Sequence, residues 1–184
     1  GRRGYWPSGV PPSGPFDSLS FRLGNRLLGN HEAAAGLEFT LNGPTLRFNR
    51  GTRVALTGAD MSASLDGQPV PRYQAVSVAP GQTLKLGKVH GDGARAYLTV
   101  AGGFQCQPYL GSRSTFTLGQ FGGHGGRALR TGDVLHLGDE PDTAGVATVP
   151  EALMPTLANQ WQLRVIYGPH GAPDFFTDDD MAAF

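Results

Sequence analysis

The sequence predicts a mainly β domain, a barrel or sandwich of many short strands with one or two short helices. Its 184 residues include 28 Gly and 14 Pro, which interrupt helices and strands and favour turns. Between these breakers lie short runs in which apolar and polar residues alternate, separated by turn signals such as Asp66-Gly67 and Pro80-Gly81. Strands this short and this regularly spaced are typical of barrels and sandwiches.

Composition and charge exclude several classes of function. The chain has 15 basic and 15 acidic side chains, so it lacks the cationic surplus that nucleic-acid binding requires. No apolar run approaches the ~18 residues that cross a bilayer. A single cysteine, Cys106, excludes an internal disulfide and fits a reducing compartment, so we expect a cytoplasmic protein. His31, His90 and His136 have no partners at ligand spacing, and we expect no metal site.

The chain begins with an arm followed by a helix. Residues 1–16 are rich in Pro and Gly, which predicts a loop or a packed arm. Apolar side chains then recur at spacings of three and four, at Phe16, Leu19, Leu23 and Leu27. This period predicts a helix over residues 17–29, in which Asp17 caps the first amides and Gly29 follows the last turn.

After residue 35 the apolar period changes to two. The runs 37–41 and 46–48 flank an Asn42-Gly43-Pro44 turn, which is typical of a β-hairpin. Further strands are expected at residues 53–57, 62–65, 75–79, 83–86, 94–100, 134–137 and 162–167.

A change of pattern near residue 145 predicts the domain organisation. Residues 140–155 lose their periodicity and contain three prolines, as in a linker or crossover. Thr177 and the acidic residues after it predict the start of a helix near the C-terminus. We therefore expect one β lobe over residues 1–145, followed by a linker and the start of a truncated second lobe over residues 146–184.

The densest group of candidate site residues lies between residues 111 and 127. Glycines flank His124 on both sides and make backbone amides accessible, while Arg113 and Arg127 supply forked cationic donors. Such a loop could bind a carboxylate or a carbonyl oxygen, although a plain turn with a surface histidine explains the same spacing. It is not a phosphate-binding loop, because the Lys-Ser/Thr ending of that motif is absent.

His170 is the second candidate acid or base. It lies in a Gly/Pro-rich loop after a predicted strand, and histidine titrates near neutral pH, but such a residue is as readily structural. Ser13 has no His or acidic residue at a telling distance, and no G-x-S-x-G motif is present.

Several motifs, in order along almost the whole chain, resemble the carboxyltransferase region of urea carboxylase, which also occurs in urea amidolyase. The motifs are Pro11-Pro12-Ser13-Gly14-Pro15, Gly111-Ser112-Arg113-Ser114-Thr115 and His170-Gly171-Ala172-Pro173-Asp174. The wider family includes one of the subunits of 5-oxoprolinase and proteins labelled allophanate hydrolase subunit 2. One departure is Phe16, where the family often has Met, a residue of similar bulk.

The resemblance implies a cyclophilin-like β-barrel and a reaction that moves a carboxyl group from carboxybiotin to urea, giving allophanate. We expect Arg113, Arg127 and the glycine amides to bind the reacting oxygens, and His124 or His170 to handle the proton. The full set of expected substrate- and biotin-binding residues is Ser13, Asp17, Ser114, Gly122, Gly123, Gly125, Arg127 and Asp174.

Biotin and ATP chemistry are expected to reside elsewhere in the enzyme. Neither Lys85 nor Lys88 has the neighbouring Met of a biotinylation motif, so a separate carrier domain must deliver carboxybiotin. No ATP-binding signature is present, which implies a biotin carboxylase partner. The family's carboxyltransferase region is longer than this chain, so we expect its remaining half as a further partner and the isolated chain to be inactive.

Two other functions remain open. The chain could belong to an ATP-dependent 5-oxoprolinase, a ring-opening amidohydrolase, as one of its subunits. It could also be a non-catalytic regulatory barrel that binds a kinase or a kinase inhibitor. A neighbouring gene for a biotin carboxylase would favour the carboxyltransferase, and one for a lactam-utilisation protein would favour the oxoprolinase.

Overall fold

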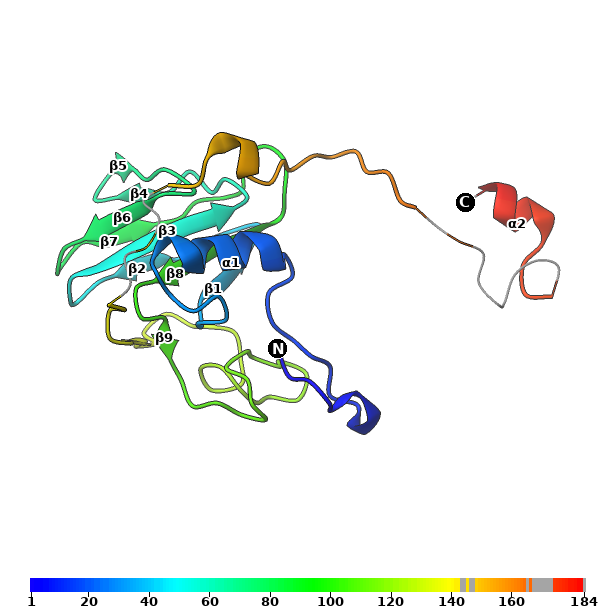
Figure 1. Cartoon of the computed structure of the whole chain (residues 1–184), viewed down its shortest axis with the longest axis horizontal. Helices are drawn as coiled ribbons and strands as arrows, with labels where there is room; N and C mark the ends of the chain where they lie inside the picture. The colour runs from blue at the N-terminus through cyan, green and yellow to red at the C-terminus, as the bar shows by residue number, and fades with distance from the viewer. Residues whose placement is uncertain (143–144, 146–147, 165, 167–173, 184) are drawn as a thin grey trace.

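The computed structural model describes residues 1–142, 145, 148–164, 166 and 174–183. Its elements, in chain order, are η1 (Trp6–Ser8), α1 (Ser18–Leu27), β1 (Leu37–Thr40), β2 (Thr45–Arg47), β3 (Thr52–Gly58), β4 (Ser64–Leu65), β5 (Gln68–Pro69), β6 (Ala75–Val78), β7 (Thr83–Lys85), β8 (Arg95–Val100), β9 (Phe104–Gln105), β10 (His136–Leu137), η2 (Glu151–Leu153) and α2 (Asp178–Ala183). The predicted mainly β fold with short helices is confirmed (Figure 1).

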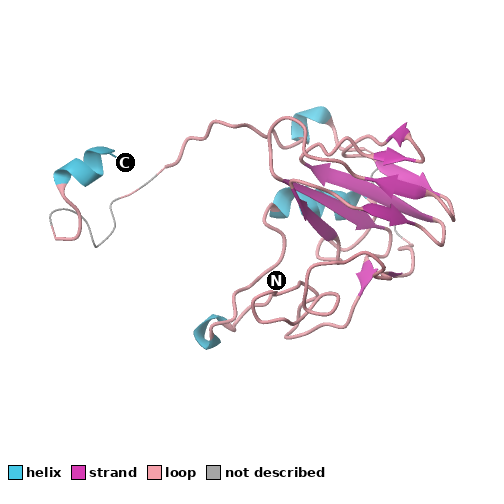
Figure 2. Cartoon of the chain, turned by 180° about the vertical axis from the view of Figure 1, so that it is seen from behind, coloured by secondary structure: helices cyan, strands magenta, loops and turns pink. Residues whose placement is uncertain are grey.

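Two four-stranded antiparallel sheets form the body of the fold. Their strand orders are β1-β8-β3-β6 and β2-β7-β4-β5, and a third ladder pairs β9 with β10. Figure 2 shows the strands in magenta. The two large sheets enclose one core in the manner of a barrel, but among the described residues hydrogen bonding does not close them into a continuous ring.

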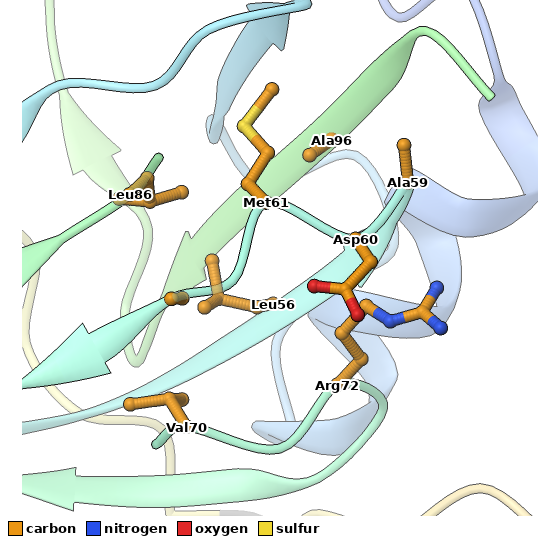
Figure 3. A pocket seen from close by; sticks show the side chains of 9 residues that line it. Leu56, Ala59, Asp60, Met61, Val70, Arg72, Leu86 and Ala96 are labelled. Atoms are coloured by element: carbon orange, nitrogen blue, oxygen red, sulfur yellow. The ribbon is translucent and has the colours of Figure 1, made fainter. Parts of the chain in front are cut away.

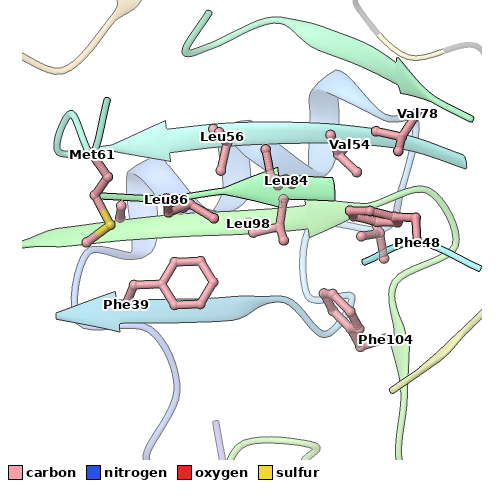
Figure 4. Packing of buried hydrophobic residues seen from close by; sticks show 12 residues of the cluster. Phe39, Phe48, Val54, Leu56, Met61, Val78, Leu84, Leu86, Leu98 and Phe104 are labelled. Carbon is pink, nitrogen blue, oxygen red and sulfur yellow. The ribbon is translucent and has the colours of Figure 1, made fainter. Parts of the chain in front are cut away.

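The core is filled by side chains from both large sheets. Val54 and Leu56 of β3 and Leu98 of β8 meet Leu84 of β7 across the interior (Figure 4). The complete buried cluster is Phe39, Phe48, Val54, Leu56, Met61, Val78, Leu84, Leu86, Ala96, Leu98, Val100 and Phe104. Burial of this apolar area supplies the main driving force that holds the sheets together.

Helix α1 covers the opposite face of β3 and β8 (Figure 1). The predicted helix, the Asp17 cap and the left-handed Gly29 after the last turn are confirmed. The helix approaches closely because Gly24 has no side chain: an added Cβ would lie 2.9 Å from Thr99 Oγ1. The apolar period wrongly predicts that Phe16 and Leu19 are buried. Both are exposed, and the small or polar Ser20 and Gly24 are buried instead.

The predicted hairpin between residues 37–41 and 46–48 is wrong. Strand β1 pairs with β8 and β2 with β7, in different sheets. The turn signal at Asn42-Gly43-Pro44 marks a change of direction, but it cannot specify the partner strand. Gly43 lies against Leu86 beside β7, where its N–H donates to the Gly87 carbonyl at 3.0 Å, and this contact directs the chain into the second sheet.

The strand predicted over residues 162–167 is also not formed in its described part. Residues 162–164 and 166 form no strand and are exposed, and the rest of the segment lies outside the described residues. Near the C-terminus the prediction is confirmed: Thr177 caps α2, because its hydroxyl accepts the Asp180 N–H at 3.2 Å while the Asp180 carboxylate accepts the Thr177 N–H at 2.9 Å.

The N-terminal arm is fastened to the sheet at the start of α1. The Asp17 N–H donates to the buried Tyr97 hydroxyl at 2.7 Å, and the Asp17 carboxylate accepts the N–H groups of Leu19 and Ser20 at 3.1 and 3.0 Å. Burial raises the pKa of the Tyr97 phenol above its ordinary value, so the hydroxyl stays protonated.

Replacing Asp17 by Ala should lower the free energy of unfolding by about 1 kcal/mol, the usual cost of losing a helix cap. Urea unfolding monitored by circular dichroism measures the change. The exposed neighbour Ser18, changed to Ala, is the matched control and should alter stability by less than about 0.5 kcal/mol. Equal effects of the two substitutions would contradict the capping role.

Candidate functional site

A hollow of about 450 Å³ lies on the long loop between β9 and β10. Its wall combines two aromatic rings, two side-chain amides and several bare glycine backbones. The lining residues are Gln107, Pro108, Tyr109, Gln120, Phe121, Gly122, Gly123, Gly125 and Gly126. Three of the expected binding residues, Gly122, Gly123 and Gly125, therefore meet in one concave surface.

Two short backbone bridges and an aromatic cluster shape this loop. Tyr109 pairs with Ser112 across a turn in which Leu110 and Gly111 have φ of 51° and 73°, and Phe116 pairs with Phe121. The ring of Phe121 lies 4.9 Å from that of Tyr109 and 5.2 Å from that of Phe116 between centroids. These rings replace a larger apolar core and hold the loop in one shape.

The glycines are required by backbone conformation and by close contact. Gly122, Gly123, Gly125 and Gly126 all have φ between 55° and 73°. The Gly126 N–H donates to the Gly122 carbonyl at 2.9 Å, and an added Cβ on Gly126 would overlap the Gln120 carbonyl. The loop is therefore an ordered backbone surface in which a side chain cannot be tolerated at every position.

Arg2 is the residue that sequence reasoning missed. It is 1% exposed, and its guanidinium donates to the Ser114 carbonyl at 2.6 Å and to Ser114 Oγ at 3.1 Å. The backbone N–H of Arg2 donates to the Pro12 carbonyl at 2.5 Å. Arg2 thus joins the N-terminal arm to the glycine loop. No local pattern reveals a contact between residues 112 positions apart.

Asp133 organises the basic residues of the loop. It accepts two hydrogen bonds from the Arg127 fork, both at 2.8 Å, and one from the Arg130 N–H at 2.7 Å. These donors hold the pKa of the Asp133 carboxyl well below its usual range, and the same hydrogen bond raises the pKa of Arg127. His124 Nε2 lies 3.6 Å from Asp133 Oδ1. The Arg127 fork is therefore turned toward Asp133.

Arg113 and Cys106 form a separate contact beside the loop. The Arg113 Nε donates to the Cys106 carbonyl at 3.0 Å, and Arg113 is exposed. Burial raises the pKa of the Cys106 thiol, although Arg113 opposes the shift. Arg113, His124 and Arg127 neighbour the hollow along the chain but do not line it.

The remaining expected site residues are dispersed. Ser13 has a φ of 55° in the arm that Arg2 contacts, and Ser114 receives the Arg2 hydrogen bonds. The Asp17 carboxylate is engaged by the start of α1. Asp174 is exposed near α2, and Figures 1 and 2 show that part of the chain apart from the glycine loop. His170 lies outside the described residues.

A second hollow lies at the end of β3 (Figure 3). Leu56, Met61 and Val70 line it, with Asp60 and Arg72 at its edge. Its volume of about 10 Å³ is that of a single water molecule, so it is too small for a metabolite. Among the described residues, no cluster of His, Cys, Asp and Glu could hold a metal ion, and no helix has the length and apolarity to cross a membrane.

Comparison with known proteins supports the resemblance seen in the sequence. Residues 8–184 match the family model described as carboxyltransferase domain, subdomain A and B. The chain belongs to the carboxyltransferase domain family.

Its relatives include much longer proteins. It is 45% identical to the urea amidolyase of Saccharomyces cerevisiae, and the match covers 100% of this chain and 10% of that protein. The crystal structure of the Kluyveromyces lactis urea carboxylase superposes with a TM-score of 0.92 at 42% identity, covering 100% of this chain and 17% of the other. A 5-oxoprolinase subunit from Haemophilus influenzae is 37% identical over 82% of this chain and 49% of that protein. The chain thus spans about a tenth of the length of the urea amidolyases that it matches.

Alanine substitutions at two glycines distinguish the stability cost of backbone strain from that of a steric overlap. Gly125 and Gly126 both have φ of 69°, but only the Cβ of Gly126 would overlap the backbone of Gln120. Gly125→Ala should lower the free energy of unfolding by about 1 kcal/mol, and Gly126→Ala by about 1–3 kcal/mol more. Urea unfolding of both variants tests this order. The reverse order would contradict the loop geometry.

The Asp133 carboxyl should titrate well below its ordinary value of 3.8 in the folded chain. Because this pKa is depressed, the stabilisation by Asp133 is present above the unfolded value and lost as the pH falls through the folded one. Carbon-13 NMR of the carboxyl carbon reports the titration.

As a control, the effects of substituting Arg127 and Arg130 on the Asp133 pKa are compared. Arg127→Ala should return the Asp133 pKa toward 3.8, whereas Arg130→Ala should not, because Arg130 donates through its backbone. An Asp133 pKa at its ordinary value of 3.8 in the unmodified chain would exclude the ion pair with Arg127.

Proposed function

We propose that this chain is part of a biotin-dependent carboxyltransferase that moves a carboxyl group from carboxybiotin to urea, with allophanate as the product. Membership of the carboxyltransferase domain family supports the reaction type. The names of the relatives, urea amidolyase and urea carboxylase, support urea as the acceptor. The observation that carries the proposal is the glycine-loop hollow, whose wall suits a planar cyclic urea.

The wall of this hollow matches the chemistry of a ureido ring. The Tyr109 and Phe121 rings offer apolar faces on which a flat ring can pack. The Gln107 and Gln120 amides can each donate and accept, as the carbonyl and N–H groups of a cyclic urea require. A volume of about 450 Å³ admits such a ring together with a small acceptor.

Within this proposal, biotin supplies a carboxyl group on a ring nitrogen. The glycine amides of the loop bind the oxygens on which negative charge develops, and Arg113 adds positive charge from the adjacent turn. Asp133, kept ionised by Arg127, lies beside the imidazole of His124, with 3.6 Å between Nε2 and Oδ1. As the carboxyl group leaves the ring nitrogen and bonds to the urea nitrogen, His124 would take the proton that the urea nitrogen loses and return it to the ring nitrogen. His170 is the alternative proton acceptor.

The proposal extends to the partners of the chain. Biotin carboxylase and biotin carrier domains of the same enzyme would produce and deliver carboxybiotin, and the other half of the carboxyltransferase region would complete the cleft. We also propose a lobe boundary near residue 145 and a cytoplasmic location. Residues beyond that boundary still pack on the first lobe, since Val149 is buried beside Leu27 and Tyr73.

A role within a 5-oxoprolinase is the second candidate function. It rests on the 37–39% identity to relatives of that name, of which this chain covers under half. A regulatory barrel without catalysis is the third. ATP-dependent ring opening of 5-oxoproline without a response to urea would select the second candidate, and kinase binding without either activity would select the third.

Tyr109→Leu should raise the KM for carboxybiotin about two- to tenfold and change kcat little, because the ring is proposed to bind rather than to react. Allophanate formation by the enzyme assembled with its biotin carboxylase and carrier domains provides the assay. Leu118→Ala, which alters an exposed residue of the same loop outside the hollow, is the control. Unchanged kinetics in both variants would exclude the hollow as the binding site.

The same assay tests the proposed polar residues. Arg113→Ala and His124→Ala should each lower kcat by at least about tenfold if they act on the reacting atoms. Activity within a few-fold of normal would remove that residue from the mechanism, and the same test applied to His170→Ala decides between the two histidines.

A further inference from the structure

The buried guanidinium of Arg2 carries a charge that no acidic residue neutralises in the described part of the chain. The ion pairs there all involve other basic residues: Arg22–Glu32, Arg53–Glu140, Arg95–Glu38, His124–Asp133 and Arg127–Asp133. Arg2 instead bonds to one carbonyl and one hydroxyl of Ser114, and its Nε is buried without a hydrogen-bond partner. A buried charge in this state is costly unless something else interacts with it.

This charge lies directly behind the wall of the hollow. The Arg2 Cζ is 4.9 Å from the centroid of the Phe121 ring, and an added Cβ on Gly122 would overlap Arg2 Nη2. Phe121 and Gly122 both line the hollow. A thin layer, one aromatic ring and one glycine backbone, therefore separates the guanidinium from a bound molecule.

Because the Arg2 guanidinium is buried, its electric field extends into the hollow. Water does not surround the guanidinium, so its charge is screened less than that of an exposed arginine. The lining residues themselves include no acidic side chain. The hollow is consequently electropositive although no cationic side chain lines it.

We propose that Arg2 is a specificity-determining residue, which makes the hollow select an anionic, N-carboxylated cyclic urea over the same ring in its neutral form. The inference rests on the proposed function and deepens it. Arg2 acts from behind Phe121 and Gly122, so it is a positioning residue that touches no substrate. Its consequence is that the carboxylated carrier is retained and the spent, neutral ring is released.

A pair of stable ligands tests the proposal. Biotinamide carries the neutral ring, and N1-carboxymethyl-biotinamide carries a carboxylate on the ring nitrogen. Titration calorimetry on the chain should give a dissociation constant about tenfold lower for the anionic ligand, and the ratio should fall as salt is raised.

Three variants distinguish the effect of the Arg2 charge from a structural effect of the Arg2 side chain. Arg2→Met should lower the affinity ratio toward one, whereas Arg2→Lys should retain a larger preference because the charge remains. Arg3→Met, at the exposed neighbouring position, should leave the ratio unchanged. If Arg2→Met does not fold, Arg2→Lys still tests the role of the charge, and equal affinity of the unmodified chain for the two ligands still overturns the proposal.

The possible results distinguish the two proposals. Equal affinity of the unmodified chain for both ligands would overturn the role of Arg2 and leave the ring site standing. Retention of the full preference in Arg2→Met would also overturn it. Binding of neither ligand would overturn the ring site itself, and with it the selectivity that depends on it.

Discussion

The contact between Arg2 and Ser114 is the interaction on which the candidate site depends. It joins the N-terminal arm, which has few backbone hydrogen bonds, to the loop between β9 and β10, which has little apolar core of its own. The guanidinium packs on Phe121, which in turn packs on Tyr109 and Phe116, so one buried cation supports the aromatic side of the hollow. The glycine backbone on the other side fits only because no Cβ occupies the space beside Arg2.

The β-sheets supply the rigid frame for this arrangement. The chain leaves β9 into the loop and returns at β10, and these two strands pair through Phe104 and Gln105. Phe104 is part of the main buried cluster, so the base of the loop is anchored in the core. The arm is anchored independently, through the hydrogen bond from Asp17 to Tyr97 on β8. Both sides of the Arg2 contact are therefore fixed to the same sheet-bound framework.

Local features of this structure could be read from the sequence, and long-range pairings could not. The Asp17 cap, the Thr177 cap and most strands follow from residue types that act on their immediate neighbours. The false hairpin at residues 37–48 shows the limit, because alternation predicts a strand but not its partner. The glycine loop was recognisable from its composition. Arg2 was not, since its role arises from a contact 112 positions away.

The central claim is that the glycine loop binds a cyclic urea ring, and NMR mapping tests it most directly. Amide resonances of the nitrogen-15-labelled chain are followed during addition of biotinamide. The account predicts that the largest shifts fall on Gln107, Tyr109 and the glycine amides between residues 122 and 126. Shifts confined to other surfaces, or no saturable shift in this loop at millimolar ligand, would contradict it.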